Sequence, residues 1–548
     1  MAWLSGATAL TKSIQQYGVD TIFTLPGAQL DPMFDALYQA KESIRVIHTR
    51  HEQGTAYMAF GYAQSTGKVG THLVVPGPGL LNASAGLSTA FACGAKVLCL
   101  AGQIPSKLIG KGIGQLHELS DQPGAVASIT KWRGRAESPA TVPEKVQEAF
   151  KQLNTGRTQP VLLEMSPDIM ASEGEVDLLD PIVDFVDLDP EPDPDLIEQA
   201  AALLGNAENP GIFIGGGIWG GEESLLSLAE QIQAPVYTSP HGNGAINDRH
   251  YLAQNLMCAK EIWDQIDVVL SVGTRYQAPA SWGKQDEKKL IRIDIDPEQS
   301  VSIAIPDIHI VSSARVSLKR LAERVQRHNR KRESREQELV QLKKTVMDRF
   351  NSVEPQYSFN KVIREELPDD GIAVFGITQL GFAAWFGFPT YEPRTLIHSG
   401  YQGTLGYAFP TALGAQVGNP DKKVIAVSGD GGFMFGVQEL ATAAQHNIGV
   451  VTIVMNDGAF GNVKRNQKED YGERYLGVEL HNPDFLKLAD AFGVMGQRVN
   501  SPEGLRNALK EAFREDGPAL IEVTVGEMPS LWKYMPLVRA KDQTREKP

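Results

Sequence analysis

The stretch from Lys422 to Gly461 constrains the fold of this chain more than any other. It contains an apolar run from Val424 to Ser428, a glycine turn, a helical pattern and a second apolar run from Val450 to Met455. Two buried strands joined through a helix run parallel, because the crossover returns the second strand in the same direction. Their carboxyl ends therefore meet at one edge of a sheet. The stretch predicts a strand–helix–strand unit of an open α/β sheet.

Each apolar run ends on a polar turn that carries an aspartate. Residues 429–432 (GDGG), with Asp430, follow the first run, and residues 456–458 (NDG), with Asp457, follow the second. Glycines let the backbone approach a phosphate, and a helix that starts after a strand favours anions. Two carboxylates beside a phosphate repel it unless a hard cation such as Mg²⁺ lies between them. The pair predicts a site for Mg²⁺ and a diphosphate, although each turn alone is also ordinary turn chemistry.

Strand and helix patterns alternate along almost the whole chain. This alternation predicts an α/β fold with three tandem doubly wound parallel-sheet domains, and 548 residues allow about three domains. We expect an N-terminal domain at residues 1–175, a central domain at 190–330 and a C-terminal domain at 353–530. An acidic, proline-rich linker at 176–195 separates the first two, and a charged helical stretch at 327–349 leads into the third.

The composition excludes several classes of protein. A hydrophobic content of 42% and a charged content of 22% are those of a soluble globular chain. The net charge of −14 and the lack of a basic stripe argue against a nucleic-acid partner. No apolar run reaches transmembrane length and no basic leader is visible, so we expect no membrane partner and a cytoplasmic location.

A second candidate site lies in the N-terminal domain at Glu52. Residues 50–54 (RHEQG) turn from a predicted strand into a predicted helix. A glutamate there is either a charge partner of the helix N-terminus or a buried carboxylate that shares a proton with a heterocycle nitrogen. The residues alone leave both roles open.

Together the two candidate sites resemble those of the thiamine diphosphate (ThDP) enzymes, in particular the acetolactate (acetohydroxyacid) synthase branch. The resemblance rests on RHEQGTAYMAFGYAQSTGKVG around Glu52, and on FTLPGAQLDPMFDAL, VVPGPGLLNASAGLSTA and LAGQIPSKLIGKG elsewhere in the N-terminal domain. In the C-terminal domain it rests on GYQGTLGYAFPTALGA, the GDG turn and YGERYLGVELHNPDFLKLADAFG. The matching segments cover nearly the whole chain in the same order.

The resemblance implies a set of residues around ThDP. Glu52 would hydrogen-bond the aminopyrimidine ring of the cofactor and promote its activation. Leu405 would hold the cofactor bent, where the family usually has Met, and the backbone of Gly403 would accept from the 4′-amino group. The other expected cofactor contacts are Thr378, Gln379, Gly429, Asp430, Gly431, Gly432, Asp457, Ala459, Phe460 and Gly461.

The resemblance also implies a metal site and an assembly. Asp430, Asp457 and the carbonyl of Ala459 would hold Mg²⁺ on the diphosphate. The family normally has Asn where Asp457 stands, so Asn456 is an alternative ligand. Glu52 and the metal site lie on different domains, which meet in this family across a subunit interface. We therefore expect a homodimer as the minimum and a homotetramer as the assembly.

The expected substrate is a 2-keto acid. We expect Gly27, Gln115 and His117 at the substrate, because Gln115 falls on the active-site glutamine of the family. His117 is either a surface-loop residue or a proton donor. Apolar Ala28 follows Gly27, and no His-His pair typical of the decarboxylase branches occurs. This favours decarboxylation followed by carbon–carbon bond formation over simple decarboxylation or lyase chemistry, which stay as alternatives.

The segment after the second turn departs from the synthase pattern. Lys464 and Arg465 stand where a tryptophan is usual. The two cations are either a solvated pair or bind a second carboxylate or phosphate. The hypothesis that follows is a substrate other than two pyruvates. A homologue that binds the cofactor without catalysis is a further alternative.

The central domain offers a rival interpretation. Residues 215–220 (GGGIWG) fit the dinucleotide pattern G-x-G-x-x-G of a nicotinamide or flavin oxidoreductase. The next strand, PVYTSP, does not end on the acidic residue that would hold a ribose hydroxyl, which argues against this interpretation. Biosynthetic synthases carry FAD here in a non-redox role. The chain is compressed between the matching motifs HGNGAIND and SVGTRYQ, so FAD stays open but is not favoured.

Overall fold

The computed structural model describes residues 1–185 and 188–535. Residues 186–187 of the predicted linker and residues 536–548 of the C-terminal tail lie outside the described residues. Three six-stranded parallel sheets are present, so the predicted α/β fold with three parallel-sheet domains is confirmed. The domain ranges 1–175, 190–330 and 353–530 stay predictions.

The chain divides into two compact units, which are described separately. The first consists of Met1–Leu188, Gly371–Thr378 and Ser399–Val525, and the second of Asp189–Asp370, Gln379–His398 and Gly526–Pro548. The first unit therefore contains the N-terminal sheet and most of the C-terminal sheet, whereas the second contains the central sheet.

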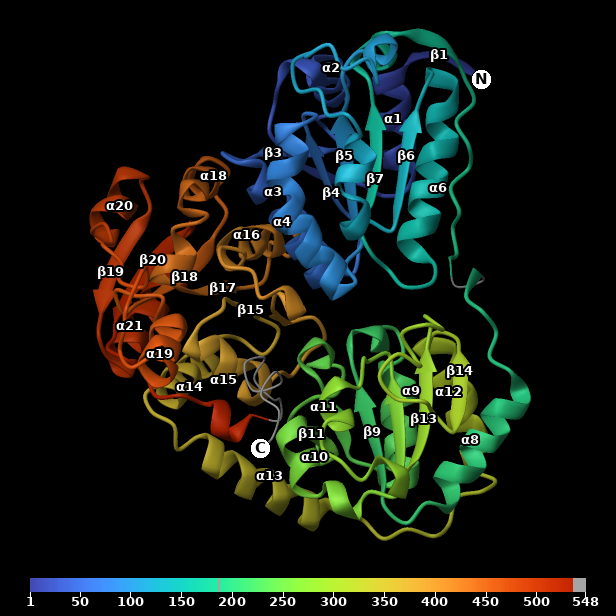
Figure 1. Ribbon diagram of the computed structural model, residues 1–548, viewed down its shortest axis with the longest axis vertical. Helices are drawn as coiled ribbons and strands as arrows, with labels where there is room; N and C mark the ends of the chain where they lie inside the picture. The colour runs from blue at the N-terminus through green and yellow to red at the C-terminus, as the bar shows by residue number, and fades with distance from the viewer. Residues whose placement is uncertain (186–187, 536–548) are drawn as a thin grey trace. The chain divides into compact units, whose positions relative to one another are not determined.

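The N-terminal sheet has the strand order β3-β2-β4-β5-β7-β6 (Figure 1). Its inner strands are buried over their whole length, because helices cover both faces. The strands are β2 (Thr21–Thr24), β3 (Arg45–His48), β4 (Gly70–Val74), β5 (Val97–Gly102), β6 (Trp132–Ala136) and β7 (Val161–Met165), and β1 (Ala2–Ser5) pairs with β8 (Glu173–Val176) in a separate antiparallel ribbon. The helices are α1 (Gly6–Gln16), α2 (Asp31–Gln39), α3 (Glu52–Thr66), α4 (Pro78–Cys93), α5 (Gln122–Ala125), α6 (Val142–Asn154) and α7 (Pro167–Ala171).

The C-terminal sheet contains the strand pair predicted from Lys422–Gly461. Strands β17 (Val424–Gly429) and β18 (Val450–Asn456) are neighbours and run parallel, with Val424 opposite Val450. The connection between them is not one helix but α17 (Asp430–Phe433), a 3₁₀ turn at Val437–Glu439 and α18 (Leu440–Gln445). The other elements of this sheet in the first unit are β15 (Ile372–Phe375), β20 (Ala519–Thr524), β19 (Met495–Val499), α16 (Ala408–Gly418), α19 (Gly461–Asp470), α20 (Phe485–Ala491) and α21 (Pro502–Ala512), in the strand order β15-β17-β18-β20-β19.

Helices α3 and α16 join the two sheets of the first unit. Their backbones approach so closely that a Cβ atom on Gly61 would lie 1.9 Å from the carbonyl oxygen of Thr411. A Cβ on Gly414 would lie equally close, 1.9 Å, to the carbonyl oxygen of Met58. Glycine is therefore needed at both crossing points, and α3 is buried along nearly all of its length because it packs on two sides.

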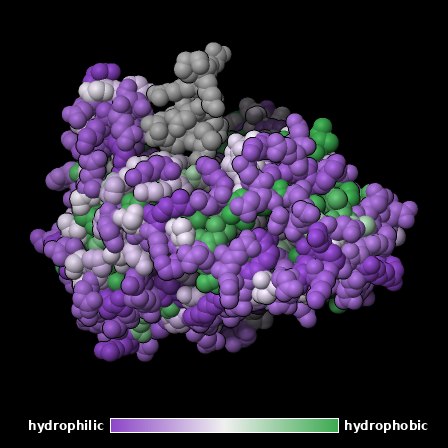
Figure 2. Space-filling view, turned by 90° about the horizontal axis from the view of Figure 1, so that it is seen from below, coloured by the Kyte–Doolittle hydropathy of each residue, from purple (hydrophilic) through white to green (hydrophobic). Residues whose placement is uncertain are grey.

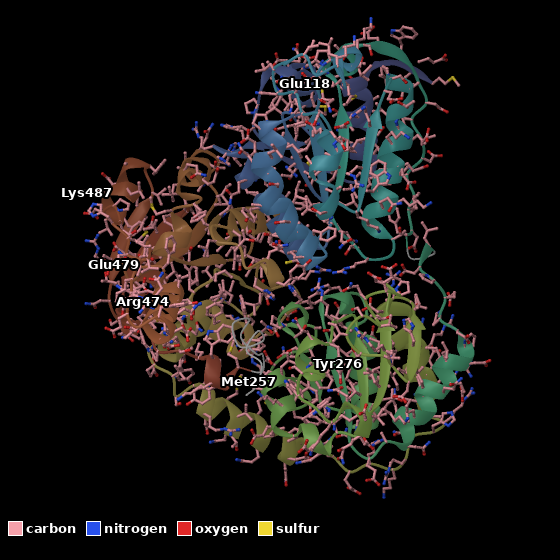
Figure 3. All side chains as sticks on the ribbon, viewed as in Figure 1. Glu118, Met257, Tyr276, Arg474, Glu479 and Lys487 are labelled. Atoms are coloured by element: carbon pink, nitrogen blue, oxygen red, sulfur yellow. The ribbon has the colours of Figure 1, made fainter. Side chains whose placement is uncertain are left out.

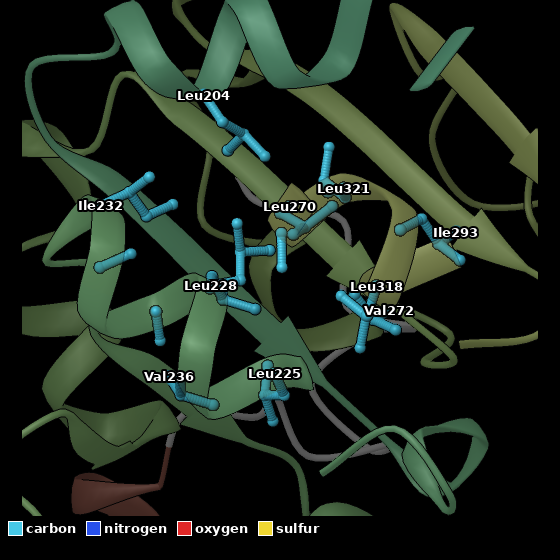
Figure 4. Packing of buried hydrophobic residues seen from close by; sticks show 14 of the residues in the cluster. Leu204, Leu225, Leu228, Ile232, Val236, Leu270, Val272, Ile293, Leu318 and Leu321 are labelled. Carbon is cyan, nitrogen blue, oxygen red and sulfur yellow. The ribbon is translucent and has the colours of Figure 1, made fainter. Parts of the chain in front are cut away.

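The second unit is built on the central sheet, with the strand order β11-β10-β9-β12-β13-β14. Leucines of helices α9 and α12 pack onto its apolar strands. Figure 4 shows Leu225 and Leu318 from the helices and Leu270 from the sheet. The strands are β9 (Pro210–Ile214), β10 (Val236–Thr238), β11 (Ala253–Asn255), β12 (Val268–Val272), β13 (Lys289–Asp294) and β14 (Ile308–Val311), with β16 (Leu396–Ile397) also in this unit. The helices are α8 (Pro194–Asn206), α9 (Glu222–Ile232), α10 (Leu256–Glu261), α11 (Gln277–Ala280), α12 (Ala314–Val325), α13 (Glu336–Phe350), α14 (Gln356–Glu366) and α15 (Gln379–Gly387).

Two general predictions can be compared with this fold. The charged stretch 327–349 is helical only from Glu336 onward, as α13. Across residues 1–185 and 188–535, no helix combines the length and the apolar character that a membrane crossing requires. On the face drawn in Figure 2, hydrophilic residues predominate.

Candidate active site

The predicted residues of the N-terminal domain gather where the strand order reverses. The chain passes from β2 to β3 on one side of the sheet and then to β4 on the other side of β2. Ligands of open α/β sheets bind in the crevice that such a reversal leaves at the carboxyl ends of the strands. Gly27 follows β2, Glu52 follows β3 and the turn at Gly77 follows β4.

Glu52 is the first residue of α3 and its side chain is buried, with 9% of the residue exposed. One carboxylate oxygen, Oε2, accepts a hydrogen bond of 3.0 Å from Nδ2 of Asn82. The other, Oε1, lies beside Gly79, where a Cβ atom would approach to 3.5 Å. The carboxylate is thus both buried and at a helix N-terminus, and its role as a partner of a heterocycle nitrogen stays a prediction.

Gly27 lies in the same crevice, against Val75. A Cβ atom on Gly27 would lie 2.4 Å from Cγ1 of Val75, and one on Gly79 would lie 2.5 Å from Cγ2 of Val75. Val75 therefore packs between Gly27 and the glycine beside Glu52. The structure brings Gly27 close to Glu52 through one apolar side chain.

The loop that carries Gln115 and His117 folds over the turn at Gly77, which follows β4. A Cβ atom on Gly77 would lie 2.5 Å from the carbonyl oxygen of His117, whose φ of 67° is left-handed. Nδ1 of His117 is buried and has no hydrogen-bond partner. Glu118 holds the loop together, since its carboxylate accepts from the backbone N–H groups of Gly112 at 3.0 Å and Gln115 at 2.9 Å (Figure 3). Glu118 is therefore a structural residue, whereas His117 keeps an unused ring nitrogen.

A buried polar network that the sequence did not predict supports this turn. Gln122 accepts from the N–H of Gly77 at 2.9 Å and donates to the carboxylate of Glu164 at 2.8 Å. Glu164 is fully buried and pairs with Arg135. The network fixes the Gly77 turn, on which His117 rests.

In the C-terminal sheet, Asp430 is the buried centre of the predicted metal site, with 2% of the residue exposed. Its Oδ1 accepts from the N–H of Gly431 at 2.9 Å, and its Oδ2 accepts from the N–H of Gly458 at 2.9 Å and from Nδ2 of Asn482 at 2.6 Å. Burial raises the pKa of the Asp430 carboxyl. Asp430 therefore ties the first turn to the second, and Asn482 is a supporting residue that the sequence did not predict.

Asp457 lies on the solvent side of the pair, where its Oδ1 accepts from the N–H of Ala459 at 3.2 Å. The surrounding protein and the neighbouring Asp430 raise its pKa to about 6. A Cβ atom on Gly461 would lie 2.5 Å from the Oδ2 of Asp457, so glycine leaves room for the carboxylate. Two neighbouring acids with raised pKa values form the kind of site that a divalent cation stabilises.

The backbone hydrogen bonds around Ala459 indicate which way its own N–H and carbonyl point. Hydrogen bonds from Leu480 N–H to the carbonyl of Gly458 and from Phe460 N–H to the carbonyl of Val478, both 2.8 Å, flank the bridge between Ala459 and Glu479. Ala459 is therefore in a non-hydrogen-bonded position, and its own N–H and carbonyl face away from the 478–480 segment. Its N–H reaches Asp457, so its carbonyl lies on the side of the carboxylates.

Asn456, the alternative ligand, is engaged elsewhere. Its Nδ2 donates to Glu522 at 2.8 Å, and its Oδ1 accepts from Nδ2 of Asn482 at 3.0 Å. This arrangement favours Asp457 over Asn456 as the residue that faces a metal.

The other residues predicted to hold the cofactor have separate surroundings. Thr378 follows β15 and Gly429 ends β17, and a Cβ atom on Gly429 would lie 3.5 Å from Cγ2 of Thr378. Gly403 has a left-handed φ of 57°, and the next residue, Thr404, shares a hydrogen bond of 2.9 Å with Thr89 of α4. Gln379 begins α15 in the second unit.

Lys464 and Arg465 have different environments. Nζ of Lys464 lies 3.0 Å from a carboxylate oxygen of Glu479, which Figure 3 labels. Arg465 is buried, with 7% exposed, so the interpretation as a solvated pair is wrong for Arg465. A buried guanidinium on α19, directly after the metal-site turn, is consistent with an anionic group in or near the site.

The glycines of the central domain are used for packing. A Cβ atom on Gly215 would lie 2.6 Å from the carbonyl oxygen of Gly273, and one on Gly217 would lie 2.7 Å from the Cα of Gly273. The loop after β9 therefore closes on the chain's own backbone instead of leaving an open cradle. The strand order is one that dinucleotide-binding folds use, but topology alone does not assign a ligand.

Comparison with known families covers all three sheets. Residues 4–125 match the family model described as thiamine pyrophosphate enzyme, N-terminal TPP binding domain, and residues 376–523 match the C-terminal TPP binding domain of the same enzymes. Residues 197–321 match their central domain. The chain belongs to the thiamine pyrophosphate enzyme family. The predicted family is thus confirmed, and thiamine pyrophosphate is the cofactor called ThDP here.

Three similar proteins align with this chain over almost their whole length. The probable acetolactate synthase large subunit of Methanocaldococcus jannaschii is 34% identical, over 95% of this chain and 92% of its own. The acetolactate synthase large subunit of Corynebacterium glutamicum is 32% identical, over 98% and 89%. A probable 2-ketoarginine decarboxylase of Pseudomonas aeruginosa is 30% identical, over 95% and 94%. This member of the thiamine pyrophosphate enzymes is therefore acetolactate synthase-like.

Proposed function

We propose that this enzyme uses ThDP and Mg²⁺ to decarboxylate a 2-keto acid and to join the remaining fragment to an acceptor. The observation that carries the proposal is the pair of acids at the carboxyl ends of β17 and β18, Asp430 and Asp457, the second of which accepts from the N–H of Ala459. Relatives named for acetolactate synthesis support the 2-keto acid and the carbon–carbon bond formation.

The residues fit the cofactor and the metal. The two carboxylates and the Ala459 carbonyl offer the hard oxygen ligands that Mg²⁺ prefers. Residues 429–432 bring backbone N–H groups to the start of α17 beside them, where a diphosphate is stabilised. When bound, ThDP would supply the carbon nucleophile and accept the electrons left by the departing carboxylate.

The side chains of the N-terminal domain would transfer protons and exclude water. Glu52 would exchange a proton with the aminopyrimidine nitrogen, and Asn82 would keep its carboxylate oriented through the 3.0 Å hydrogen bond. Val75, packed against Gly27, would exclude water from the apolar side of the crevice. His117, with its unused Nδ1, would donate a proton to substrate or product oxygen, and Gln115 would contact the substrate.

We also propose a homodimer as the smallest active unit and a homotetramer as the assembly. Large apolar side chains are exposed around both sites of the first unit, as an interface requires. Leu476 is 85% exposed, and the others include Leu81, Ile113, Leu116 and Phe435.

A complementation experiment tests whether each site spans two subunits. Glu52→Gln and Asp430→Asn variants are each inactive in this scheme, but a mixed dimer contains one site with both residues intact. Activity that returns when the two variants are refolded together supports a shared site. If each site lies within one subunit, the mixture stays inactive.

The substrate is tested with purified enzyme, ThDP and Mg²⁺ on a panel of 2-keto acids with product identification. Because Lys464 and Arg465 stand where synthases have tryptophan, we propose a substrate other than two pyruvates. Rapid acetolactate formation from pyruvate alone would refute this part.

A second candidate, favoured by the similarity to a 2-ketoarginine decarboxylase, is simple decarboxylation. Aldehyde release without a ligated product identifies it.

For FAD, Gly215 and Gly217 are needed for their close packing on Gly273, so these glycines do not by themselves support a flavin, and no step is assigned to one. Absorbance of the purified protein near the flavin band tests this directly.

A further inference from the structure

A buried carboxylate of the C-terminal sheet holds the turn that leads into Glu52. Glu439 is 0% exposed and ends the 3₁₀ turn before α18. Its Oε1 accepts from the N–H groups of Arg50 at 3.2 Å and His51 at 3.1 Å, and its Oε2 accepts from the N–H of Arg50 at 3.1 Å and from Oγ1 of Thr442 at 2.6 Å. All its backbone partners lie within two residues of Glu52.

The carboxylate of Glu439 packs closely against the N-terminus of α3. A Cβ atom on Gly54, in the first turn of α3, would lie 2.7 Å from Oε1 of Glu439. Glycine at this position therefore leaves room for the carboxylate. A helix N-terminus favours an anion, and the N–H donors compensate for the burial that raises the pKa of Glu439.

Further contacts along α18 extend this junction. Arg50 donates from Nη2 to the side chain of Gln445 at 3.3 Å, and Arg45 donates to the carbonyl of His446 at 3.4 Å. The rings of His48 and His446 lie 5.0 Å apart. The strand and turn that precede Glu52 are therefore docked along one short segment of the C-terminal sheet.

That segment is continuous with the metal site. Asp430 begins α17, and the chain reaches Glu439 through one 3₁₀ turn, with no other strand in between. The acid of the proposed metal site and the carboxylate that fixes Arg50 and His51 therefore belong to one short segment of the chain.

We propose that Glu439 is a positioning residue for Glu52: it fixes the backbone from which Glu52 points and couples that backbone to the Asp430 segment. This rests on the proposed function, in which Glu52 activates bound ThDP. A general acid–base group displaced by about 1 Å loses much of its effect, so geometry held by Glu439 is expected to control the rate of activation.

The test compares Glu439→Gln with a matched control, Asp267→Asn. Glutamine has the same shape, but it carries no negative charge, and its amide nitrogen in the place of Oε2 cannot accept from the N–H of Arg50 or the hydroxyl of Thr442. Like Glu439, Asp267 is a carboxylate that accepts from backbone N–H groups, in this case those of Glu208, Asn209 and Val268, but it belongs to the central sheet. Three quantities are measured: amide hydrogen exchange of residues 49–56 in the ThDP-free protein, ThDP affinity, and the rate at which bound ThDP exchanges its C2 proton for deuterium.

For Glu439→Gln we expect faster amide exchange at residues 49–56, unchanged ThDP affinity and C2 exchange slowed by about tenfold or more. For Asp267→Asn we expect C2 exchange at the wild-type rate. Wild-type C2 exchange in Glu439→Gln, despite loosened amides, overturns the proposal and leaves the function intact. A wild-type protein that does not bind ThDP overturns the proposed function instead.

If Glu439→Gln does not fold, Thr442→Val gives a milder version of the same test. It removes the 2.6 Å donor to the Glu439 carboxylate and leaves the backbone contacts in place. A smaller but measurable slowing of C2 exchange supports the proposal, and an unchanged rate overturns it.

Discussion

Replacement of Asp457 by asparagine tests the proposed metal site through the stability of the metal-free protein. The surrounding protein and Asp430 raise the pKa of Asp457 from 3.8 to about 6. The folded protein therefore keeps a proton on Asp457 at pH values where the unfolded chain has lost it. The stability that this proton provides is lost as the pH rises through about 6, and above that pH the ionised pair of acids destabilises the fold.

The size of this effect follows from the shift. A change of about two pKa units corresponds to about 3 kcal/mol if nothing screens the charge. Asp457 is exposed on one side, so solvent weakens the interaction and we expect about 1 kcal/mol. Asparagine carries no charge, and Asp457→Asn should therefore be the more stable protein at about pH 8 and lose this advantage at about pH 4.

Thermal unfolding of the metal-free protein at the two pH values measures the difference. Asp516→Asn is the control, because it removes the same charge from an exposed position far along the chain. Mg²⁺ should reverse the order: it neutralises the pair of acids and so stabilises the wild type more than the variant. Cofactor binding should accordingly depend more strongly on Mg²⁺ in the wild type.

The reasoning is refuted by equal unfolding temperatures of wild type and Asp457→Asn at both pH values. It is also refuted by Mg²⁺ titrations that coincide for the two proteins. A variant less stable than the wild type at about pH 8 without metal would show that the two carboxylates do not repel each other as the geometry indicates.

Other substitutions test the supporting structure. Asn482→Ala removes a 2.6 Å donor to the buried acid of the metal site, so Mg²⁺-dependent ThDP affinity should fall about tenfold, measured by fluorescence titration; an unchanged affinity would count against this role. Gly61→Ala places a Cβ 1.9 Å from the carbonyl oxygen of Thr411 and should destabilise the protein by about 3 kcal/mol, whereas Gly526→Ala, which meets no atom within 4 Å, should not. Glu52→Gln should abolish cofactor-dependent turnover and keep ThDP binding, because the metal-site residues are untouched; turnover without Glu52 would contradict its assigned role.

Local patterns were sufficient for the strands and for the position of the acids. The runs predicted as Val424–Ser428 and Val450–Met455 form β17 and β18, each one residue longer than expected, because apolar residues bounded by polar turns leave few alternatives. The glycine turn expected at 429–432 forms the short helix α17 instead of an open turn. The helix expected after it is present but short: it begins after Gly436, as a 3₁₀ turn that runs directly into α18.

The supporting residues could not be predicted, because their roles depend on contacts between distant parts of the chain. Glu439 meets His51 across 388 residues, and Gln122 meets Gly77 across 45. Neither residue lies in a motif with its partner. A buried carboxylate or amide is recognisable only when the fold shows which N–H groups surround it.

The two sheets of the first unit have the same strand order but carry different residues at their turns, so the topology alone does not determine the chemistry of a site. Strands β2-β4-β5-β7-β6 and β15-β17-β18-β20-β19 follow the same order, so both sheets present a crevice at the carboxyl ends of their strands. In one crevice the turns carry a glutamate, glycines and an apolar valine, which suit a proton acceptor away from water. In the other they carry two aspartates and glycines, which suit a metal and a diphosphate. The fold therefore supplies two equivalent edges, and it is the residues at the turns on which the proposed base and the proposed metal site depend. Glu439 is the contact that makes the geometry of the first depend on the second.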